Sequence, residues 1–173
     1  FLNFPKSYVC YSKNMTKLKI IPLLFSIGVC FLAAAAGSAF TIGAIDTWYV
    51  TLNKPFFSPP NWVFGPVWTL LYLMMGISFY IFLNTKTNAK EKRLGLSLFY
   101  VQLALNALWS ILFFGLKSQI AAFIGIILLW LAIFLTIRSF LQISKGAGWL
   151  LIPYLAWVSF ATILNFSIVV LNR

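Results

Sequence analysis

Five long stretches of this chain contain no charged residue, and they limit its possible folds more than any other feature. They comprise residues 20–45, 55–85, 94–116, 118–137 and 146–172. A helix needs about 20 apolar residues to cross the hydrocarbon core of a bilayer, and every stretch reaches that length. A transmembrane β-barrel would instead need alternating segments of about ten residues. We therefore predict an all-α membrane protein, a bundle of five transmembrane helices.

The composition agrees with a membrane location and excludes several kinds of active site. Apolar residues make up 62% of the chain and charged residues only 9%, too few to cover the surface of a water-soluble domain. The chain has no histidine, and its only acids are Asp46 and Glu91. A Ser-His-Asp triad, a histidine-ligated metal and a catalytic pair of carboxylates are therefore excluded. Cys10 and Cys30 are too few for a disulfide scaffold. We expect no metal site, no cofactor and no acid–base catalytic residue.

The net charge of +11 reflects membrane topology rather than nucleic-acid binding. The basic residues lie between apolar stretches instead of on one polar face, so we expect no nucleic-acid partner. Ten basic residues fall on the side of the N-terminal tail and three (Lys54, Lys117 and Arg173) on the other. Cytoplasmic loops are enriched in Lys and Arg. The charge bias therefore predicts a multi-pass protein of a prokaryotic cell membrane, with its N-terminus in the cytoplasm.

The chain divides into a basic tail, residues 1–19, and a five-helix domain, residues 20–173. Met15 is followed by Thr-Lys-Leu-Lys and has the character of a natural start. Residues 1–14 are therefore interpreted either as an upstream extension or as part of the tail. The first apolar stretch is longer than the apolar region of a cleavable signal peptide, so we expect it to be retained as a helix.

The connection between the first two predicted helices is rich in proline and aromatic residues. It reads Asp46-Thr-Trp-Tyr-Val-Thr-Leu-Asn-Lys-Pro-Phe-Phe-Ser-Pro-Pro-Asn-Trp62. Proline fixes its own backbone angle and restricts the residue before it, so we expect a structured loop. Two interpretations remain open: an aromatic belt at the level of the lipid headgroups, or a lid over a cavity between the helices.

Polar residues inside the predicted spans repeat at helical spacing. Gln102, Asn106 and Ser110 fall on one face of the third helix, and the fifth helix carries Ser159, Thr162 and Asn165. Exposing such groups to lipid is costly, so both faces should point into the bundle. They either join neighbouring helices or form the polar rim of a ligand cavity.

Small and aromatic residues also recur on single helix faces. Ala35, Ala39 and Gly43 form a stripe on the first helix that favours close helix packing or a dimer face. The aromatic residues Trp68 and Tyr72 share a face of the second helix. Such rings either pack the bundle or form a flat apolar slot for a planar ligand.

Three ordered, tryptophan-containing motifs resemble a known family. They read Trp48-Tyr49-xxx-Asn53-Lys54-Pro55 with Ser58-Pro-Pro-Asn-Trp-Val-Phe-Gly-Pro-Val-Trp68-Thr-Leu-Leu-Tyr72-xxx-Gly76, then Gln102-Leu-Ala-Leu-Asn106-xx-Trp109-xxx-Phe-Phe-Gly115, and Pro153-Tyr-Leu-Ala-Trp157-Val-Ser-Phe-Ala161-Thr-Ile-Leu-Asn165. They resemble the translocator protein family (TspO/MBR), which includes the tryptophan-rich sensory proteins and the peripheral-type benzodiazepine receptors. The resemblance extends over roughly residues 20–172.

The resemblance implies a five-helix membrane receptor or sensor that binds porphyrins and other hydrophobic small molecules and pairs as a homodimer. The family's pocket lies between the helices, beneath the first loop. The positions in this chain that match it are Tyr49, Trp68, Asn106, Trp109, Trp157 and Ala161. Some bacterial members are reported to degrade porphyrin in light, which would involve Trp68 and Trp157.

Three functional hypotheses follow. The first is a tetrapyrrole-binding receptor or sensor with an aromatic pocket. The second is light-dependent porphyrin degradation; since the predicted spans contain no general acid, general base or metal site, the excited porphyrin, oxygen and nearby indoles would supply the chemistry. The third is transport of porphyrins or other hydrophobic molecules. Transporters coupled to protons or sodium ions usually carry acidic residues or histidine within their spans. The five predicted spans contain neither, so we expect any transport to be passive.

Overall fold

The structure, a computed structural model, describes residues 19–173, and its regular elements are all helical. The elements are α1 (Ile20–Ile45), η1 (Tyr49–Thr51), α2 (Asn61–Asn84), α3 (Ala89–Ser110), η2 (Ile111–Gly115), α4 (Gln119–Ile143), α5 (Lys145–Leu150) and α6 (Ile152–Leu171). Together they form five helical segments long and apolar enough to cross a membrane. The predicted all-α, five-span fold is therefore confirmed. The predicted tail lies outside the described residues, except for Lys19.

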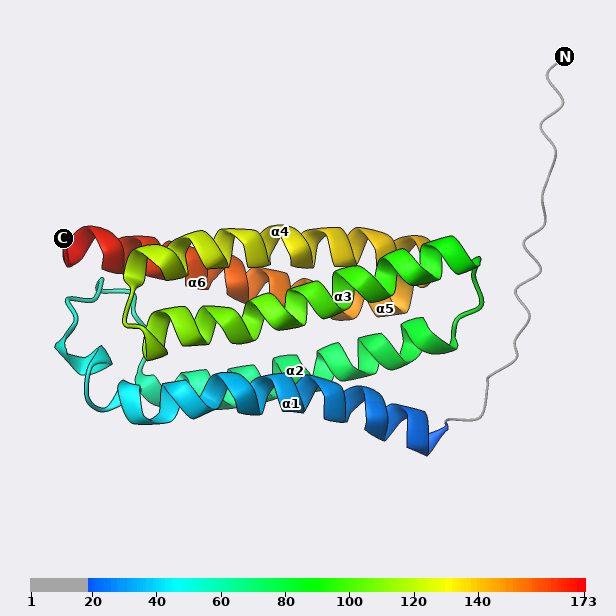
Figure 1. The fold of residues 1–173 in the computed structure, drawn as a ribbon, viewed down its shortest axis with the longest axis horizontal. Coiled ribbons are helices and arrows are strands. Elements are labelled where there is room, and N and C mark those ends of the chain that lie inside the picture. The colour runs from blue at the N-terminus through cyan, green and yellow to red at the C-terminus, as the bar shows by residue number, and fades with distance from the viewer. Residues whose placement is uncertain (1–18) are drawn as a thin grey trace, which may run out of the picture.

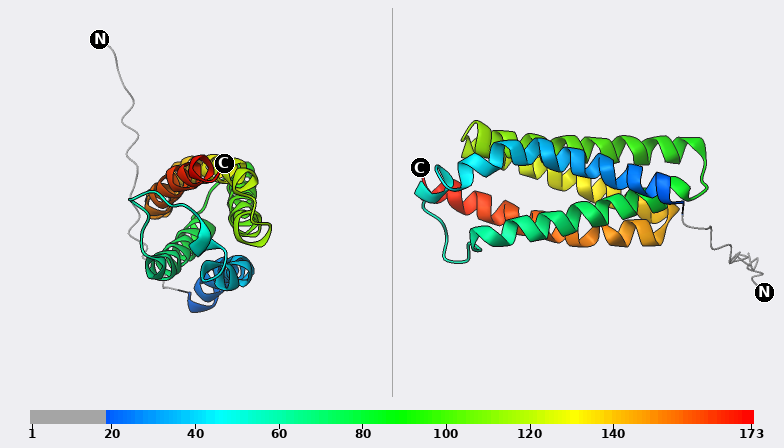
Figure 2. Two further views of the ribbon diagram at one scale, coloured as in Figure 1. Left: turned by 90° about the vertical axis from the view of Figure 1, so that its left-hand side faces the viewer. Right: turned by 90° about the horizontal axis from the view of Figure 1, so that it is seen from below.

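The five spans run side by side along one long axis (Figure 1). α1 packs on α2 and α3, and α4 packs on α3 and α6. The connection between α1 and α2 and the C-terminus of the chain lie at the same end, which we name the loop end (Figure 2). The opposite end carries the turn between α2 and α3 and the junction between α4 and α5; we name it the basic end.

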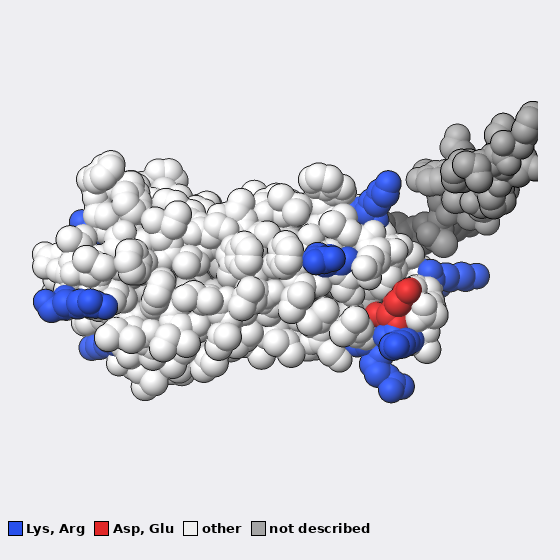
Figure 3. Space-filling view, turned by 90° about the horizontal axis from the view of Figure 1, so that it is seen from above, with Lys and Arg blue, Asp and Glu red and all other residues white. Residues whose placement is uncertain are grey.

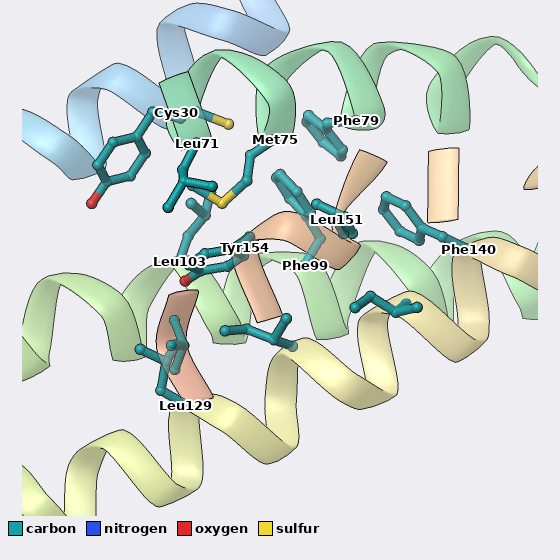
Figure 4. Close-up of a cluster of buried hydrophobic side chains, with 14 of the residues drawn as sticks. Cys30, Leu71, Met75, Phe79, Phe99, Leu103, Leu129, Phe140, Leu151 and Tyr154 are labelled. Atoms are coloured by element: carbon teal, nitrogen blue, oxygen red, sulfur yellow. The ribbon is translucent and has the colours of Figure 1, made fainter. Parts of the chain in front are cut away.

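Toward the basic end, the interior of the bundle is packed with aromatic rings. Phe79 of α2 stacks on Phe99 of α3 with 4.2 Å between ring centroids, and Phe99 also stacks on Phe140 of α4 (Figure 4). α1 approaches α2 closely because residue 76 is glycine: a Cβ atom there would lie 2.7 Å from the Cα of Ile27. Toward the basic end, the described helices are therefore closely packed.

Two spans extend beyond the boundaries predicted from the charges. α3 begins at Ala89 instead of residue 94, and the side chain of Asn88 caps it by accepting a hydrogen bond from the Glu91 N–H at 2.8 Å. α4 continues to Ile143 and includes Arg138. Long basic side chains near a helix end can reach the membrane surface while their backbone stays helical. A charged residue therefore does not mark the end of a span.

The fifth span is divided, whereas the sequence predicted one continuous stretch over residues 146–172. α5 ends at Leu150, and α6 begins at Ile152 with Pro153 in its first turn. Proline has no backbone N–H to donate, so it is tolerated in the first turn of a helix but not in the middle of one. The break at Leu151 therefore places Pro153 at a new helix start, and the long second part of the span carries Trp157 and Ala161.

Candidate ligand-binding site

A cavity of about 600 Å³ lies between α1, α2, η2 and α6 toward the loop end. This volume is within the usual range for small-molecule sites. Aromatic side chains dominate its walls: Phe31, Tyr49, Trp62, Phe64, Trp68, Tyr72, Trp109, Phe113, Phe114 and Trp157. Two lining residues, Ile42 of α1 and Trp62 of α2, are 73% and 75% exposed. The cavity therefore reaches the outer surface between α1 and α2.

Five of the six residues singled out from the sequence line this one cavity. They are Tyr49 from η1, Trp68 from α2, Trp109 from α3, and Trp157 and Ala161 from α6. Trp68 and Tyr72 lie one turn apart on α2, with 5.6 Å between ring centroids. Separate segments of the chain thus supply the walls, and each places its matched residue on the inward side.

Asn106, the sixth residue, lies one layer behind the cavity wall. It is 3% exposed, and both halves of its amide are engaged. Its Oδ1 accepts a hydrogen bond from the Tyr72 hydroxyl, and its Nδ2 donates to the Tyr154 hydroxyl at 2.8 Å. Tyr72 reaches the cavity in its place. In this arrangement Asn106 positions Tyr72, and it could touch a ligand directly only if one of the two tyrosines moved.

The indole N–H groups around the cavity differ in their hydrogen bonding. Trp109 donates to Oδ1 of Asn165 at 3.3 Å, and Nδ2 of Asn165 donates in turn to the carbonyl oxygen of Gln119 at 3.2 Å. No described residue accepts a hydrogen bond from the indole of Trp68 or Trp157. These two indoles line the cavity and have an N–H without a described acceptor.

Trp157 forms the wall between the cavity and a groove on the outside of the bundle. The groove lies between α2 and α6, and its lining includes Val67, Met74 and Pro153. Trp157 lines both spaces. Its indole packs edge-on against Phe64, with 6.1 Å between centroids. The orientation of this one ring therefore shapes one side of the cavity.

The connection between α1 and α2 covers the cavity at the loop end. The ring of Tyr49 is 4% exposed and lies against Phe64, Phe113 and Phe114, at centroid distances of 6.4, 6.2 and 6.0 Å. Burial raises the pKa of the Tyr49 phenol above its ordinary value. Lys54 lies 4.5 Å from the centroid of the same ring. These contacts agree with the lid interpretation of the loop.

Other aromatic residues of this region face outward, as expected of a belt at the membrane surface. Phe56 is fully exposed, and Trp62 is 75% exposed. Such rings suit the headgroup level of a bilayer. The two interpretations of the sequence thus apply to different residues of the same region: Tyr49 closes the cavity, Phe56 is fully exposed, and Trp62 stands where the cavity opens to the outer surface.

A π-helical turn brings Phe113 and Phe114 into the cavity wall, which sequence reasoning missed. Phe113 and Phe114 are consecutive residues of η2, and both line the cavity. η2 follows α3 without a break, and the N–H of Leu116 donates to the carbonyl oxygen of Ile111 at 2.8 Å. Such wider turns are frequent at functional sites, but nothing in the periodicity of this segment indicated one.

The polar faces predicted on two helices divide between the two suggested roles. Asn106 and Ser159 join helices, the latter by accepting a hydrogen bond from the Trp130 indole at 2.7 Å. Ser110 and Asn165 lie at the cavity. Gln102 is 1% exposed, as expected for an inward face, and its amide has no described partner.

The fold and the site together define a class: a helical membrane protein of five spans, with an aromatic cavity covered by its first loop. The chain belongs to the TspO/MBR family, whose model matches residues 26–171. It is 46% identical over 154 residues to "Tryptophan-rich protein TspO" of Chlorobaculum tepidum, covering 89% of this chain and 98% of that protein. It is 47% identical over 156 residues to the protein of the same name in Archaeoglobus fulgidus, covering 90% and 99%. The human "Translocator protein" is 39% identical over 138 residues, covering 79% and 82%.

Proposed function

We propose that this protein binds a planar, largely apolar ligand of the tetrapyrrole class in the cavity beneath the first loop, and acts as a receptor or sensor for it. One observation carries the proposal. Trp68 and Trp157, from two different spans, line the same cavity, and no described residue accepts a hydrogen bond from either indole. Flat rings suit stacking, and the free donors suit polar groups at the edge of the ligand.

The energetics favour a ligand with a large aromatic face. Each aromatic contact contributes about 0.5–1.5 kcal/mol beyond the area that it buries. Tyr72 adds a ring beside Trp68, and its hydroxyl is held by Asn106. A mostly apolar pocket with a few convergent polar groups is the usual form of a small-molecule site. A molecule such as protoporphyrin IX combines an extended aromatic face with two carboxylates and fits this pattern.

The test is a titration of the purified protein with protoporphyrin IX, haem and non-planar apolar molecules of similar size, monitored by tryptophan fluorescence. We expect saturable quenching by the porphyrins at one ligand per chain. With no histidine in the chain and Cys30 buried, iron has no strong axial ligand in the cavity, so haem and protoporphyrin should bind with similar affinity. Equal quenching by the non-planar molecules would contradict the proposal.

Light-dependent degradation of the bound porphyrin is a second candidate, supported by the same two indoles. If Trp68 and Trp157 stack against a photo-excited porphyrin, they are the nearest oxidisable groups. The measurement is the loss of porphyrin absorbance in light and in darkness, with free porphyrin in detergent as the control. Loss of absorbance that occurs only in light and only with protein would support degradation. Equal loss from protein-bound and free porphyrin in light would exclude it.

Passive transport is the third candidate, and it is supported by the opening of the cavity between α1 and α2. The relatives include the human "Translocator protein" and a "Tryptophan-rich sensory protein" of Cereibacter sphaeroides. The names of the relatives thus refer both to translocation and to sensing. Porphyrin flux into sealed vesicles, with and without protein, distinguishes transport from sensing. Flux at the protein-free rate would exclude transport.

We further propose that two copies pair through α1. Ala35, Ala39 and Gly43 are exposed on this helix, and the space beside Gly43 is open. Small residues allow two helices to approach closely in a membrane. An Ala39→Cys variant in a Cys10→Ser background should cross-link to itself under oxidation. Failure to cross-link, with Ala39→Cys still accessible to a small thiol reagent, would contradict pairing at this face.

A further inference from the structure

Of the ten basic side chains of the described residues, Lys54, Lys117 and Arg173 lie at the loop end, and seven gather at the basic end of the bundle (Figure 3). The seven are Lys19, Lys86, Lys90, Lys92, Arg93, Arg138 and Lys145. The same end holds a single acid, Glu91, whose carboxylate already accepts a hydrogen bond from the Thr87 hydroxyl at 2.5 Å. The basic end therefore carries a large excess of positive charge that the described protein does not neutralise.

One of these cations, Lys92, makes its hydrogen bonds within the protein. The Lys92 ammonium donates to the carbonyl oxygens of Phe82, Leu83 and Thr85 at 2.5, 2.8 and 3.0 Å. These carbonyls are at the C-terminal end of α2, where helices leave such groups without partners. Lys92 thus completes the end of α2, and the other basic side chains stay available to an external anion.

Arg138 lies deeper than the rest of the cluster. α4 has 25 residues, so it is about 37 Å long, compared with about 30 Å for the hydrocarbon core of a bilayer. Arg138 precedes the last residue of α4 by five positions, which is about 7.5 Å along the axis. Its backbone therefore lies near the boundary between hydrocarbon and headgroups, on the hydrocarbon side.

The surroundings of Arg138 are those of a lipid-facing surface. Arg138 is exposed, and its guanidinium carbon lies 6.0 Å from the ring centroid of Phe134, one turn deeper in the span. Leu131 and Leu135 on the same helix are 47% and 48% exposed. A charged group at this depth normally pairs with an opposite charge. The bilayer offers one at this level, the phosphate of a lipid headgroup.

A second cation lies on the neighbouring helix, somewhat nearer the basic end than Arg138. α3 touches α4 where a Cβ atom at Gly95 would lie 3.2 Å from Oγ of Ser139. Arg93 is two residues from this contact on α3, and Arg138 is one residue from it on α4. Both are exposed. The two arginines therefore lie on adjacent helices near the membrane surface, with Arg93 about half a turn round α3 from this contact.

We propose that Arg138 is the centre of a binding site for the headgroup of an anionic phospholipid, with Arg93 of the neighbouring helix adding to the positive charge around it. Guanidinium groups bind phosphate oxygens through paired hydrogen bonds. The acyl chains would lie along the exposed Leu131, Phe134 and Leu135. A zwitterionic headgroup brings its own cation into this positive cluster and fits less well, while free phosphate lacks the chains. The site is separate from the aromatic cavity, which lies toward the other end of the bundle.

Native mass spectrometry of the detergent-purified protein tests this site. The protein is titrated with dioleoyl phosphatidylglycerol or dioleoyl phosphatidylcholine, and bound lipids are counted. We expect phosphatidylglycerol to bind at several-fold lower concentration, and a tenfold excess of inorganic phosphate to leave it bound. Equal binding of the two lipids would overturn the proposal, as would displacement by phosphate, which would indicate a site for free anions.

Variants assign the preference to the two arginines. Arg138→Gln should reduce the preference for phosphatidylglycerol, and the Arg138→Gln/Arg93→Gln double variant should abolish it. Arg138→Lys keeps the charge and should retain most of it. Lys117→Gln removes a cation at the loop end and is the matched control, expected to bind both lipids as the unmodified protein does. If Arg138→Gln does not fold, the lipid preference of the Arg93→Gln variant is measured instead, and it should be weaker than that of the unmodified protein. A preference that survives loss of the arginines would refute the assignment.

Discussion

The side-chain amide of Asn172 pairs with both backbone polar groups of Asn53, which is 119 residues away in the sequence. The Asn53 N–H donates to Oδ1 of Asn172 at 2.9 Å, and Nδ2 of Asn172 donates to the Asn53 carbonyl oxygen at 2.9 Å. The same Nδ2 also donates to the carbonyl oxygen of Ile168 at 2.8 Å. A residue at the end of α6 thus holds the loop of Tyr49 in place over the cavity.

We predict that Asn172→Ala speeds release of a bound ligand. Each hydrogen bond of this kind contributes about 0.5–1.5 kcal/mol, so losing the two to Asn53, about 1–3 kcal/mol together, should favour opening of the loop by about 5- to 150-fold. Stopped-flow measurement of porphyrin dissociation checks this. Asn84→Ala, which removes an exposed helix-end amide at the basic end, is the control. Unchanged dissociation in Asn172→Ala would mean that the loop does not limit release.

Tyr72→Phe should lower the free energy of unfolding by about 1–3 kcal/mol, because it leaves the buried Oδ1 of Asn106 without its donor. Thermal unfolding in detergent, followed by circular dichroism, is the measurement. Tyr100→Phe makes the same chemical change on the 47% exposed Tyr100 and should have little effect. Equal stability of the two variants would contradict the positioning role given to Asn106.

Gly76→Ala should destabilise the bundle by about 1–3 kcal/mol, the usual cost of overpacking. Its new methyl group would lie 2.7 Å from a backbone atom of α1, which cannot move aside as a flexible side chain could. Gly28→Ala adds the same methyl group where nothing lies within 4 Å, and it should be neutral or slightly stabilising. The comparison of the two unfolding midpoints tests whether α1 packs as closely on α2 as described.

The orientation of the chain in the membrane is still a prediction from its charges. Phe56 in the first loop is fully exposed, so a Phe56→Cys variant in a Cys10→Ser background offers one accessible thiol; Cys30 is buried. With the N-terminus in the cytoplasm, a membrane-impermeant thiol reagent should label Phe56→Cys in intact cells. Labelling only after permeabilisation would reverse the assignment.

The spans could be predicted from the sequence because lipid tolerates few charges, and the uncharged stretches therefore mark them. Their ends could not, because Arg138 lies inside α4 while its side chain can reach the membrane surface. The break at Leu151 also depends on backbone hydrogen bonding around Pro153, which hydropathy does not record.

The residues that line the cavity could be predicted in part. The matched motifs named Trp68, Trp109 and Trp157, which do face one space. Sequence spacing placed Asn106 on the correct helix face but could not show that Tyr72 stands between it and the cavity. The contribution of Phe113 and Phe114 depends on the wider turn of η2, which changes side-chain directions without changing the residue pattern.

The affinity of Trp157→Phe for protoporphyrin IX, measured beside Leu128→Val, tests the central claim most directly. Trp157→Phe keeps a ring in the wall but removes indole area and the free N–H, while Leu128 is 50% exposed on α4 and lines neither the cavity nor the outer groove. Losing one stacking contact of about 0.5–1.5 kcal/mol corresponds to about two- to tenfold weaker binding. We predict that loss in Trp157→Phe, with an unchanged helical spectrum, and none in Leu128→Val. Equal affinity in the two variants would contradict a porphyrin site at this cavity.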